Sequence, residues 1–497
     1  MEAQTISTLP RSNMKKGLFI RKPIRAVQTA ETDEDHHQLK RHLGPINLTA
    51  IGIGAIIGAG IFVVTGQAAA LYAGPAVILS FLLVAIICVL AGLCYAELSA
   101  MIPVSGGSYS YSYVAMGEFP AWLVGWSITG QILFSTSTVA VGWSGYCVSI
   151  LRDMGFHLSP LLTSSPIAYS VDAGWHLTGA FVNLPAIVLV VLIGTMISIG
   201  IKAATHFNNI MVAIKLSTIA LFILLGFSYI NWENLTPFIP ENTGHFGEFG
   251  WSGVIRGASF LFFAYIGFDT VSTLAQESIN PQKDLPKGIL GSLLISATAY
   301  VATALVLVGI VNYTQLNVPD PMSLALNAMG SSFAWLKAVV KLAILAGLAS
   351  VVLVQTLSLT RVFLTMSKDG LLTKPFAKIN KSTQTPLFSS VVTALCCVVI
   401  SGLFPVNVLA GLVSMLTLFL FAIVCLGVLI LRYLHPEFER PFKVPLVPVI
   451  PGLGMLACIG QMVYLPMSIW LQFAIWLVVG LAIYFGYGIK HSKLRHS

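Results

Sequence analysis

The stretch GIGAIIGAGIF, residues 52–62, decides how this chain is built. Four glycines interrupt an apolar run there: Gly52, Gly54, Gly58 and Gly60. Counted from Asn47 at about 1.5 Å per residue, Gly58 lies roughly 16 Å into a helix that spans a bilayer, near its midpoint. Glycines at that depth let the backbone leave helical geometry, and the amides that this frees attract an anion such as a carboxylate. Close packing of small residues against another helix is the alternative explanation.

A second interrupted run, SFLFFAYIGFDTVST over residues 259–273, has Gly267 and Asp269 at a comparable depth. The two runs are the first and the sixth of the chain, five helices apart. Two interrupted helices at corresponding positions of two five-helix halves are typical of inverted-repeat transporters. Free amides at one break and free carbonyls at the other match the carboxylate and the amine of an α-amino acid. The pair therefore predicts a site for an amino acid.

The composition places the chain in a membrane. Of its 497 residues, 56% are apolar and 9% are charged, and the mean hydropathy is +0.85. A soluble protein carries about 25% Asp, Glu, Lys and Arg, so soluble domains are excluded, as are disordered, collagenous and disulfide-rich secreted proteins. The seven cysteines lie in apolar runs without metal-ligand spacing, which predicts buried apolar residues. We expect no metal and no cofactor.

The apolar runs predict an all-α polytopic membrane protein with 12 transmembrane helices, since a bilayer core about 30 Å thick needs about 20 apolar residues. The runs lie near residues 47–71, 75–101, 119–151, 184–201, 205–230, 252–275, 286–311, 333–366, 387–404, 407–433, 446–466 and 468–489. Three parts follow: a cytoplasmic N-terminal tail over 1–45, a transport core over 46–433, and the last two helices with a cytoplasmic C-terminus over 434–497.

The basic residues predict the orientation of these helices. With the N-terminus inside, 22 of the 27 Lys and Arg residues fall in inner segments, and only Arg152 and Lys337 fall outside. Inner loops of membrane proteins carry this excess, so the basic pI of 9.1 reflects topology rather than binding to nucleic acid. We predict that both termini lie in the cytoplasm and that the protein spans the cytoplasmic membrane.

Three basic residues fall within the spans, where a charge is expensive and indicates function. Lys215 lies about ten residues into the fifth span and has no charged residue four positions away on either side. It is either a proton carrier or a permanently charged lysine that ties unwound carbonyls together, and both roles place it beside the first break. Arg256 and Lys341 lie near outer ends, where their side chains can reach the interface.

Other polar residues within the spans leave alternatives open. Asp269 either binds a proton or ligand, or caps the second half of the sixth helix, which we favour. Glu97 is either part of a gate or a surface charge near the inner end of the second span. Gln131 either lines the pocket or bonds another helix.

Several motifs together resemble the amino acid–polyamine–organocation superfamily, and within it bacterial homologues of the cationic amino acid transporters. The matching stretches are LGPINLTAIGIGAIIGAGIFVVTG (43–66), YAELSAMIPVSGGSYSY (95–111), GEFPAWLVGW (117–126), VAVGWSGY (139–146), FFAYIGFDTVSTLAQESINPQKDLPKGI (262–289), TRVFLTMSKDGLL (360–372) and RPFKVPLVPVIPGLGMLACIGQMVYLP (440–466). They run in order from about residue 40 to the C-terminus.

The resemblance implies a LeuT-like fold of 5+5 inverted repeats followed by two further helices. It also implies the substrate-binding positions Gly58, Ala59, Gly60, Phe263, Ala264 and Ile266, and we predict Ile56, Gln131, Ser135 and Gly267 as further substrate-binding positions. In the family the substrate carboxylate meets amides of the first break, and the amine meets carbonyls of the second. Lys215 matches a lysine that stands where sodium-coupled relatives hold a sodium ion, which implies proton coupling, with Asp269 as a further candidate.

The chain departs from the family pattern at two positions. Gln131 stands where close relatives usually carry an acid, which weakens a cationic substrate, and Ala59 stands where many relatives have Ser or Thr. Ser135 and Thr136, one turn further on, make the pocket more polar.

We predict a proton-coupled symporter of L-amino acids that works by alternating access in the bilayer. An exchanger of amino acids or polyamines with the same fold is the first alternative. A membrane-embedded enzyme is the remote one, because the histidines are scattered and form no set with a nucleophile. The expected partners are an L-amino acid, protons and lipid, and a small membrane subunit is left open.

Overall fold

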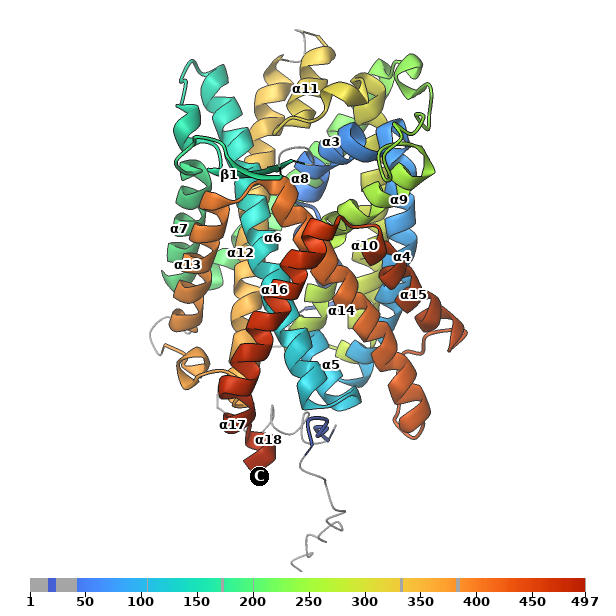
Figure 1. The fold of residues 1–497 in the computed structure, drawn as a ribbon, viewed down its shortest axis with the longest axis vertical. Coiled ribbons are helices and arrows are strands. Elements are labelled where there is room, and N and C mark those ends of the chain that lie inside the picture. The colour runs from blue at the N-terminus through green and yellow to red at the C-terminus, as the bar shows by residue number, and fades with distance from the viewer. Residues whose placement is uncertain are drawn as a thin grey trace, which may run out of the picture.

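The computed structural model describes residues 17–23, 43–104, 106–170, 174–199, 201–330, 334–380 and 385–496. Helices dominate this part of the chain (Figure 1). Most of the predicted N-terminal tail lies outside the described residues. That includes its acidic and histidine patch (Glu31, Asp33, Glu34, Asp35, His36 and His37) and most of its basic residues.

The helices follow the apolar runs of the sequence. Their bounds are α2 Pro45–Ile56, α3 Thr65–Ala68, α4 Val77–Met101, α5 Gly107–Ala115, α6 Glu118–Asp153, α7 Leu184–Ile199, α8 Ile201–Gly226, α9 Gly250–Leu261, α10 Pro281–Ile310, α11 Pro321–Ala328, α12 Ala334–Lys368, α13 Leu387–Leu403, α14 Val406–Leu434, α15 Val449–Val463, α16 Met467–Ile483, α17 Ile489–His491 and α18 Lys493–His496. The strands β1 Ile167–Ser170 and β2 Gly174–Leu177 form an antiparallel hairpin that pairs Ile167 with Leu177.

Seven helical stretches within the described residues are long and apolar enough to cross a membrane. They are Pro45–Met101, Ile210–Tyr229, Gly250–Ala275, Pro281–Ile310, Leu336–Lys368, Val406–Leu434 and Met467–His496. Three shorter apolar helices accompany them: Leu184–Ser198, Leu387–Leu403 and Val449–Val463. The protein is therefore a multi-pass helical membrane protein. Every one of the twelve predicted runs overlaps a helix, and the 57 residues of the first stretch contain two of the runs.

The helices pack in an order that differs from their order in the chain. α10 lies along α4 and α2, while α6 lies along α12 and α14. α7 and α13 pack together at one side of the molecule, and α15 lies at the opposite side beside α14 (Figure 1). α2 contacts α8, α10 and α12, so the first interrupted helix is surrounded by other helices.

Both predicted interruptions are present in the structure. α2 ends at Ile56, Ile57 is extended, and the chain resumes as a π-helical turn over Gly60–Val64. α9 ends at Leu261, passes through a 3₁₀ turn over Phe262–Tyr265, and becomes extended at Ile266.

The two broken segments pack backbone against backbone. Gly267 has a φ of +128°, which favours glycine, and a Cβ there would lie 2.6 Å from the carbonyl carbon of Ala55. Gly60 packs just as closely against the backbone of Ala264. Small residues therefore serve both purposes that the sequence allowed, because they permit the breaks and also allow the close approach.

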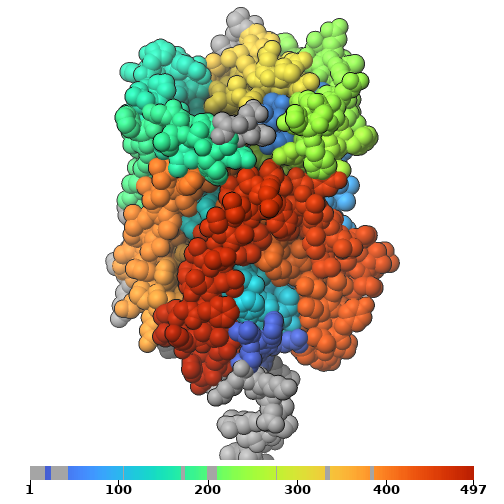
Figure 2. All heavy atoms as spheres, in the orientation of Figure 1, coloured from blue at the N-terminus to red at the C-terminus, as the bar shows by residue number. Residues whose placement is uncertain are grey.

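Contacts between the chain ends and the helices tie one end of the molecule together. Glu118, which is fully buried, accepts hydrogen bonds from Tyr484 at 2.9 Å and from Arg495 at 2.7 Å. Lys22 pairs with Asp369 at 2.7 Å. Residues 17–23 lie on the surface at this end, in blue beside the C-terminal helices (Figure 2). The hairpin and α11 lie at the other end (Figure 1).

Two of the intramembrane charges have partners that the sequence did not reveal. Glu97 is 1% exposed and receives two hydrogen bonds from Arg432, at 2.9 and 2.7 Å, so it is a buried ion-pair partner rather than a surface charge. Lys341 is also 1% exposed. It bonds Ser149 and Asp153 instead of extending to the interface, so the snorkelling interpretation of this lysine was wrong. The sequence shows that a residue lies near a helix end, but it does not show which neighbouring helix covers its side chain.

Candidate functional site

Lys215 binds backbone carbonyls at the first break. Its side chain is 1% exposed, and its ammonium donates to the carbonyl of Gly54 at 2.9 Å and to that of Ile57 at 3.0 Å. These carbonyls belong to the last turn of α2 and to the residue after it. The C-terminal end of a helix carries partial negative charge from such unpaired carbonyls, which a cation stabilises. The structure therefore places Lys215 directly against the broken segment, as the sequence predicted.

The amides on the other side of the same break are free. Among the residues that the structure describes, no acceptor faces the backbone N–H groups of Gly58, Ala59 and Gly60. Gly58 and Ala59 are buried, so bulk water cannot satisfy these donors. Buried amides without acceptors are costly, and at the start of a half-helix they form a place for an anion. This part of the site can bind a carboxylate.

The second break offers acceptors. Within the described residues the carbonyl of Ile266 receives no hydrogen bond, and that of Phe263 receives only a long one, 3.5 Å from the amide of Ile266. The amide of Phe263 donates to Ser414 of α14 at 3.0 Å. An ammonium group can therefore find carbonyl oxygens here.

The carboxylate of Asp269 binds the backbone in the turn between the two halves of this helix. One oxygen of its carboxylate accepts from the amide of Gly267 at 3.1 Å. This bond lies before the 3₁₀ helix Asp269–Glu277, whose N-cap residue Phe268 makes no side-chain cap bond within the described residues, so the structure does not show the capping role that we favoured from the sequence. Gln131 is also close enough to interact with Asp269, and it donates to Thr417 of α14 at 3.2 Å. Both alternatives for Gln131 thus have an observation behind them, since it bonds another helix and lies beside the second break.

Tyr300 joins the two breaks. Its hydroxyl lies 2.7 Å from the carbonyl oxygen of Ile56 and 2.8 Å from that of Ala264. A hydroxyl has a single proton, so it satisfies one carbonyl fully at a time. Ile56 and Ala264, both predicted as site residues, therefore share one donor from α10. The sequence did not identify this tyrosine, because it lies among serines and threonines of an otherwise apolar run and its partners belong to other segments.

Among the described residues, the side-chain hydrogen bonds of Ser135 go to α12 and not to either break. Its hydroxyl and that of Thr136 bond the side-chain amide of Gln355 on α12, with Ser135 at 2.8 to 3.1 Å and Thr136 at 3.2 Å. These three residues form a polar link between α6 and α12. Gln355 was also missed, although a glutamine in the middle of an apolar run is a signal that could have identified it.

The geometry can now be compared with known proteins. The family model "Amino acid permease" matches residues 43–487. The chain belongs to this amino acid permease family. The family resemblance expected from the motifs is therefore confirmed, and the protein is a transporter rather than an enzyme.

Three relatives show how the similarity is distributed. The chain is 41% identical to the methylthioribose transporter of Bacillus subtilis (strain 168), over 96% of this chain and 99% of the relative. It is 39% identical to the branched-chain amino acid permease BcaP of the same organism, over 97% and 100%. It is 35% identical to the vacuolar cationic amino acid transporter 2 of Arabidopsis thaliana, over 85% of this chain and 65% of the relative.

The bridge made by Tyr300 leads to a prediction. We expect Tyr300→Phe to fold, with a loss of about 1–3 kcal/mol because a buried carbonyl loses its donor, and to reduce uptake by at least about tenfold, because the two breaks lose their shared bond. Uptake into proteoliposomes and thermal unfolding in detergent measure the two effects.

Tyr265→Phe is the matched control. The hydroxyl of Tyr265 is buried too, and within the described part of the chain it bonds only the carbonyl of Phe81 on α4, at 3.1 Å. Equal losses of uptake in the two variants would show that the bridge has no special role.

Proposed function

We propose that this permease is a secondary active transporter that carries L-amino acids together with protons across the cytoplasmic membrane. One observation supports this most strongly. Buried, unpaired amides at Gly58, Ala59 and Gly60 lie beside buried carbonyls of the second break, so donors for a carboxylate and acceptors for an amine adjoin each other. An α-amino acid presents this pair of groups whatever its side chain is.

The proposed architecture is a LeuT-like 5+5 inverted repeat of twelve spanning helices, with two additional helices at the C-terminal end. It is supported by the overlap of each apolar run with a helix, and by breaks in the first and sixth of these helices. We further propose that both termini lie in the cytoplasm, with the division of the chain at residues 45 and 433. The basic residues gathered in the predicted inner segments favour this orientation.

The side chains around the breaks favour a substrate with an uncharged side chain. Asp269 is the only acidic residue among the described contacts of the two breaks, and it is engaged by the amide of Gly267. Gln131 is neutral where relatives usually carry an acid. The relatives are named for branched-chain amino acids, for methylthioribose and for cationic amino acids. Of these three substrate classes, branched-chain amino acids agree best with a site that has no free carboxylate.

Lys215 is the proposed link between the proton and the substrate. In its charged form it holds the carbonyls of Gly54 and Ile57 and so fixes the end of α2. The amides that would bind the carboxylate follow directly after Ile57. Loss of the proton weakens the attraction between the amine and the helix end, which lets the break change shape when the substrate leaves. In alternating access, this change would accompany rocking of the helices that carry the breaks.

An exchanger is the second candidate function. The hydrogen bonds of Lys215 agree with this function as well. Two short hydrogen bonds to backbone carbonyls are also what a permanently charged, purely structural lysine would make. A transporter with such a lysine would exchange amino acids without responding to a pH gradient.

Binding tests the substrate class. We expect the purified protein to be stabilised against heat by L-amino acids with uncharged side chains, by about 2.7 kcal/mol at a hundredfold excess over the dissociation constant. The corresponding amines without a carboxylate, and the acids without an amine, should stabilise it much less, because each leaves one break unpaired. If none of the twenty amino acids stabilises the protein, the proposed function is wrong.

Substitution of Lys215 tests the coupling. We expect Lys215→Met to fold and to keep counterflow of labelled amino acid, because the amides of the break are unchanged. Accumulation driven by an inward proton gradient in proteoliposomes should fall to the level seen without a gradient. The control is Lys490→Met, a lysine in the C-terminal segment. Undiminished proton-driven accumulation in Lys215→Met would exclude the proposed role and favour the exchanger.

A further inference from the structure

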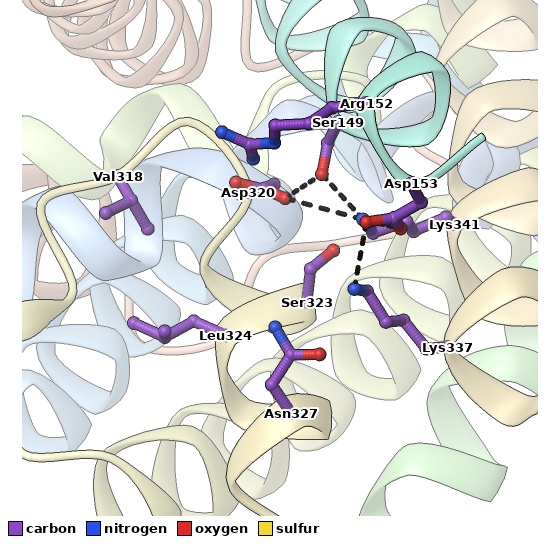
Figure 3. A pocket seen from close by; sticks show the side chains of 10 residues that line it. All are labelled: Ser149, Arg152, Asp153, Val318, Asp320, Ser323, Leu324, Asn327, Lys337 and Lys341. Atoms are coloured by element: carbon purple, nitrogen blue, oxygen red, sulfur yellow. Dashed lines mark hydrogen bonds and ion pairs between the residues drawn. The ribbon is translucent and has the colours of Figure 1, made fainter. Parts of the chain in front are cut away.

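A cavity of about 350 Å³ lies near the end of the molecule that carries α11 (Figure 3). It is formed by the last turn of α6, the beginning and middle of α11, and the first turns of α12. Under the proposed orientation this is the outer end. The volume falls within the range of small-molecule sites.

The cavity lies in series with the first break along α6. Gly142 of α6 faces the break, since a Cβ there would lie 3.5 Å from the Cβ of Ala59. Ser149, which lines the cavity, is seven residues further on, about 10 Å along a helix. Between them, the hydroxyl of Tyr146 donates to the carbonyl of Phe62 at 2.6 Å, just beyond the break. A molecule in the cavity is thus about two helical turns from the proposed binding site.

A network of charges builds one wall of the cavity. The buried ammonium of Lys341 donates to Ser149 and to Asp153, both at 2.6 Å, and Lys337 donates to Asp153 at 3.1 Å. Burial opposes the charge on Asp153, but the hydrogen bonds from Lys341 and Lys337 outweigh it and hold the pKa of this carboxyl below its usual value. Asp153 is therefore ionised at neutral pH and fully engaged by the two lysines.

Three side chains in the same cavity have polar groups that are not fully engaged in hydrogen bonds or ion pairs. The hydroxyl of Ser323, 2% exposed, has no hydrogen-bond partner within the described part of the chain, and it points toward Ser149, Asp153 and Lys341 (Figure 3). Arg152 has no acidic partner among the described residues. Asp320 accepts from Ser149 but lies 3.9 Å from Lys341, so its carboxylate is only loosely paired.

We propose that this cavity is a second binding site for an α-amino acid zwitterion on its way to the breaks. The carboxylate would be held by the guanidinium of Arg152 and the hydroxyl of Ser323, and the ammonium by the carboxylate of Asp320. A buried hydroxyl without a partner is costly, and a carboxylate in the cavity satisfies it. Val318 and Leu324 also line the cavity, which gives an apolar side chain a place to lie. This inference rests on the proposed function for its choice of ligand.

Equilibrium dialysis of the purified full-length chain with labelled L-alanine tests the site. We expect two molecules bound per chain in the unaltered protein. The double variant Arg152→Gln with Ser323→Ala should bind one molecule, with the affinity of the outer site reduced by at least about tenfold. His157→Gln is the control, because it is exposed in the segment that follows α6 and does not line the cavity.

Transport gives a second readout that a structural role would not move. The double variant should raise KM for uptake from the outer side severalfold and leave kcat and the KM for efflux unchanged. One bound L-alanine in both proteins, or a double variant that unfolds more easily but binds two, would overturn the proposal. Equal competition by acetate and by L-alanine would also overturn it, since it would indicate a site for anions only.

Different results would exclude the proposed transport function and the proposed outer site. If the proposed function is wrong, the unaltered protein takes up no L-amino acid into proteoliposomes, whatever the outer cavity binds. If only the outer site is wrong, uptake and one binding event persist, and the double variant does not change them.

Discussion

The fold depends on how the backbone of α2 is satisfied where it breaks. Inside a bilayer no water is available for a free carbonyl or amide, so a broken helix is stable only if other groups replace the lost hydrogen bonds. Lys215 does this for the carbonyls of Gly54 and Ile57. It does nothing for the amides of Gly58, Ala59 and Gly60, which have no acceptor among the residues that the structure describes. The asymmetry leaves an unpaired set of donors in the centre of the protein, and this is where the proposed substrate carboxylate binds.

The backbone of the second break packs directly against the backbone of the first. Gly60 packs against Ala264, and Gly267 packs against Ala55, so neither segment can move far without the other. Tyr300 adds a polar connection, because its single proton is shared by carbonyls of both segments. The carboxylate of Asp269 accepts from the amide of Gly267 and so adds a bond within the second broken segment. These contacts connect the carbonyls held by Lys215 to the proposed acceptors for the amine, as the proposed coupling between a proton and a substrate would require.

Local signals in the sequence predicted the parts of this arrangement that depend on one segment. Hydropathy located the helices, and glycines near the midpoint of an apolar run located both breaks. The position of Lys215 beside the first break also followed, because a lone charge at that depth needs backbone carbonyls or an acid as a partner. A role for Asp269 at the second break also followed from its position two residues after a glycine, although its carboxylate binds the amide of Gly267 and does not cap the helix.

Contacts between distant segments were not predictable in this way. Tyr300, Gln355 and Ser414 lie in apolar runs that also hold other serines and threonines, and the partners of these three residues depend on the rotation and depth of each helix. Lys341 shows the same limit, since its partners come from α6 and from the turn before α11. Composition can show that such a group needs a partner, but the packing of several helices decides which one it finds.

The central claim is tested most directly by an experimental structure in lipid with an amino acid bound. The account predicts that the carboxylate lies within hydrogen-bonding distance of the amides of Gly58, Ala59 and Gly60, with the ammonium facing the carbonyl of Ile266 and Lys215 on the opposite side of the break. An amino acid bound elsewhere, while those amides stay unpaired, would contradict it.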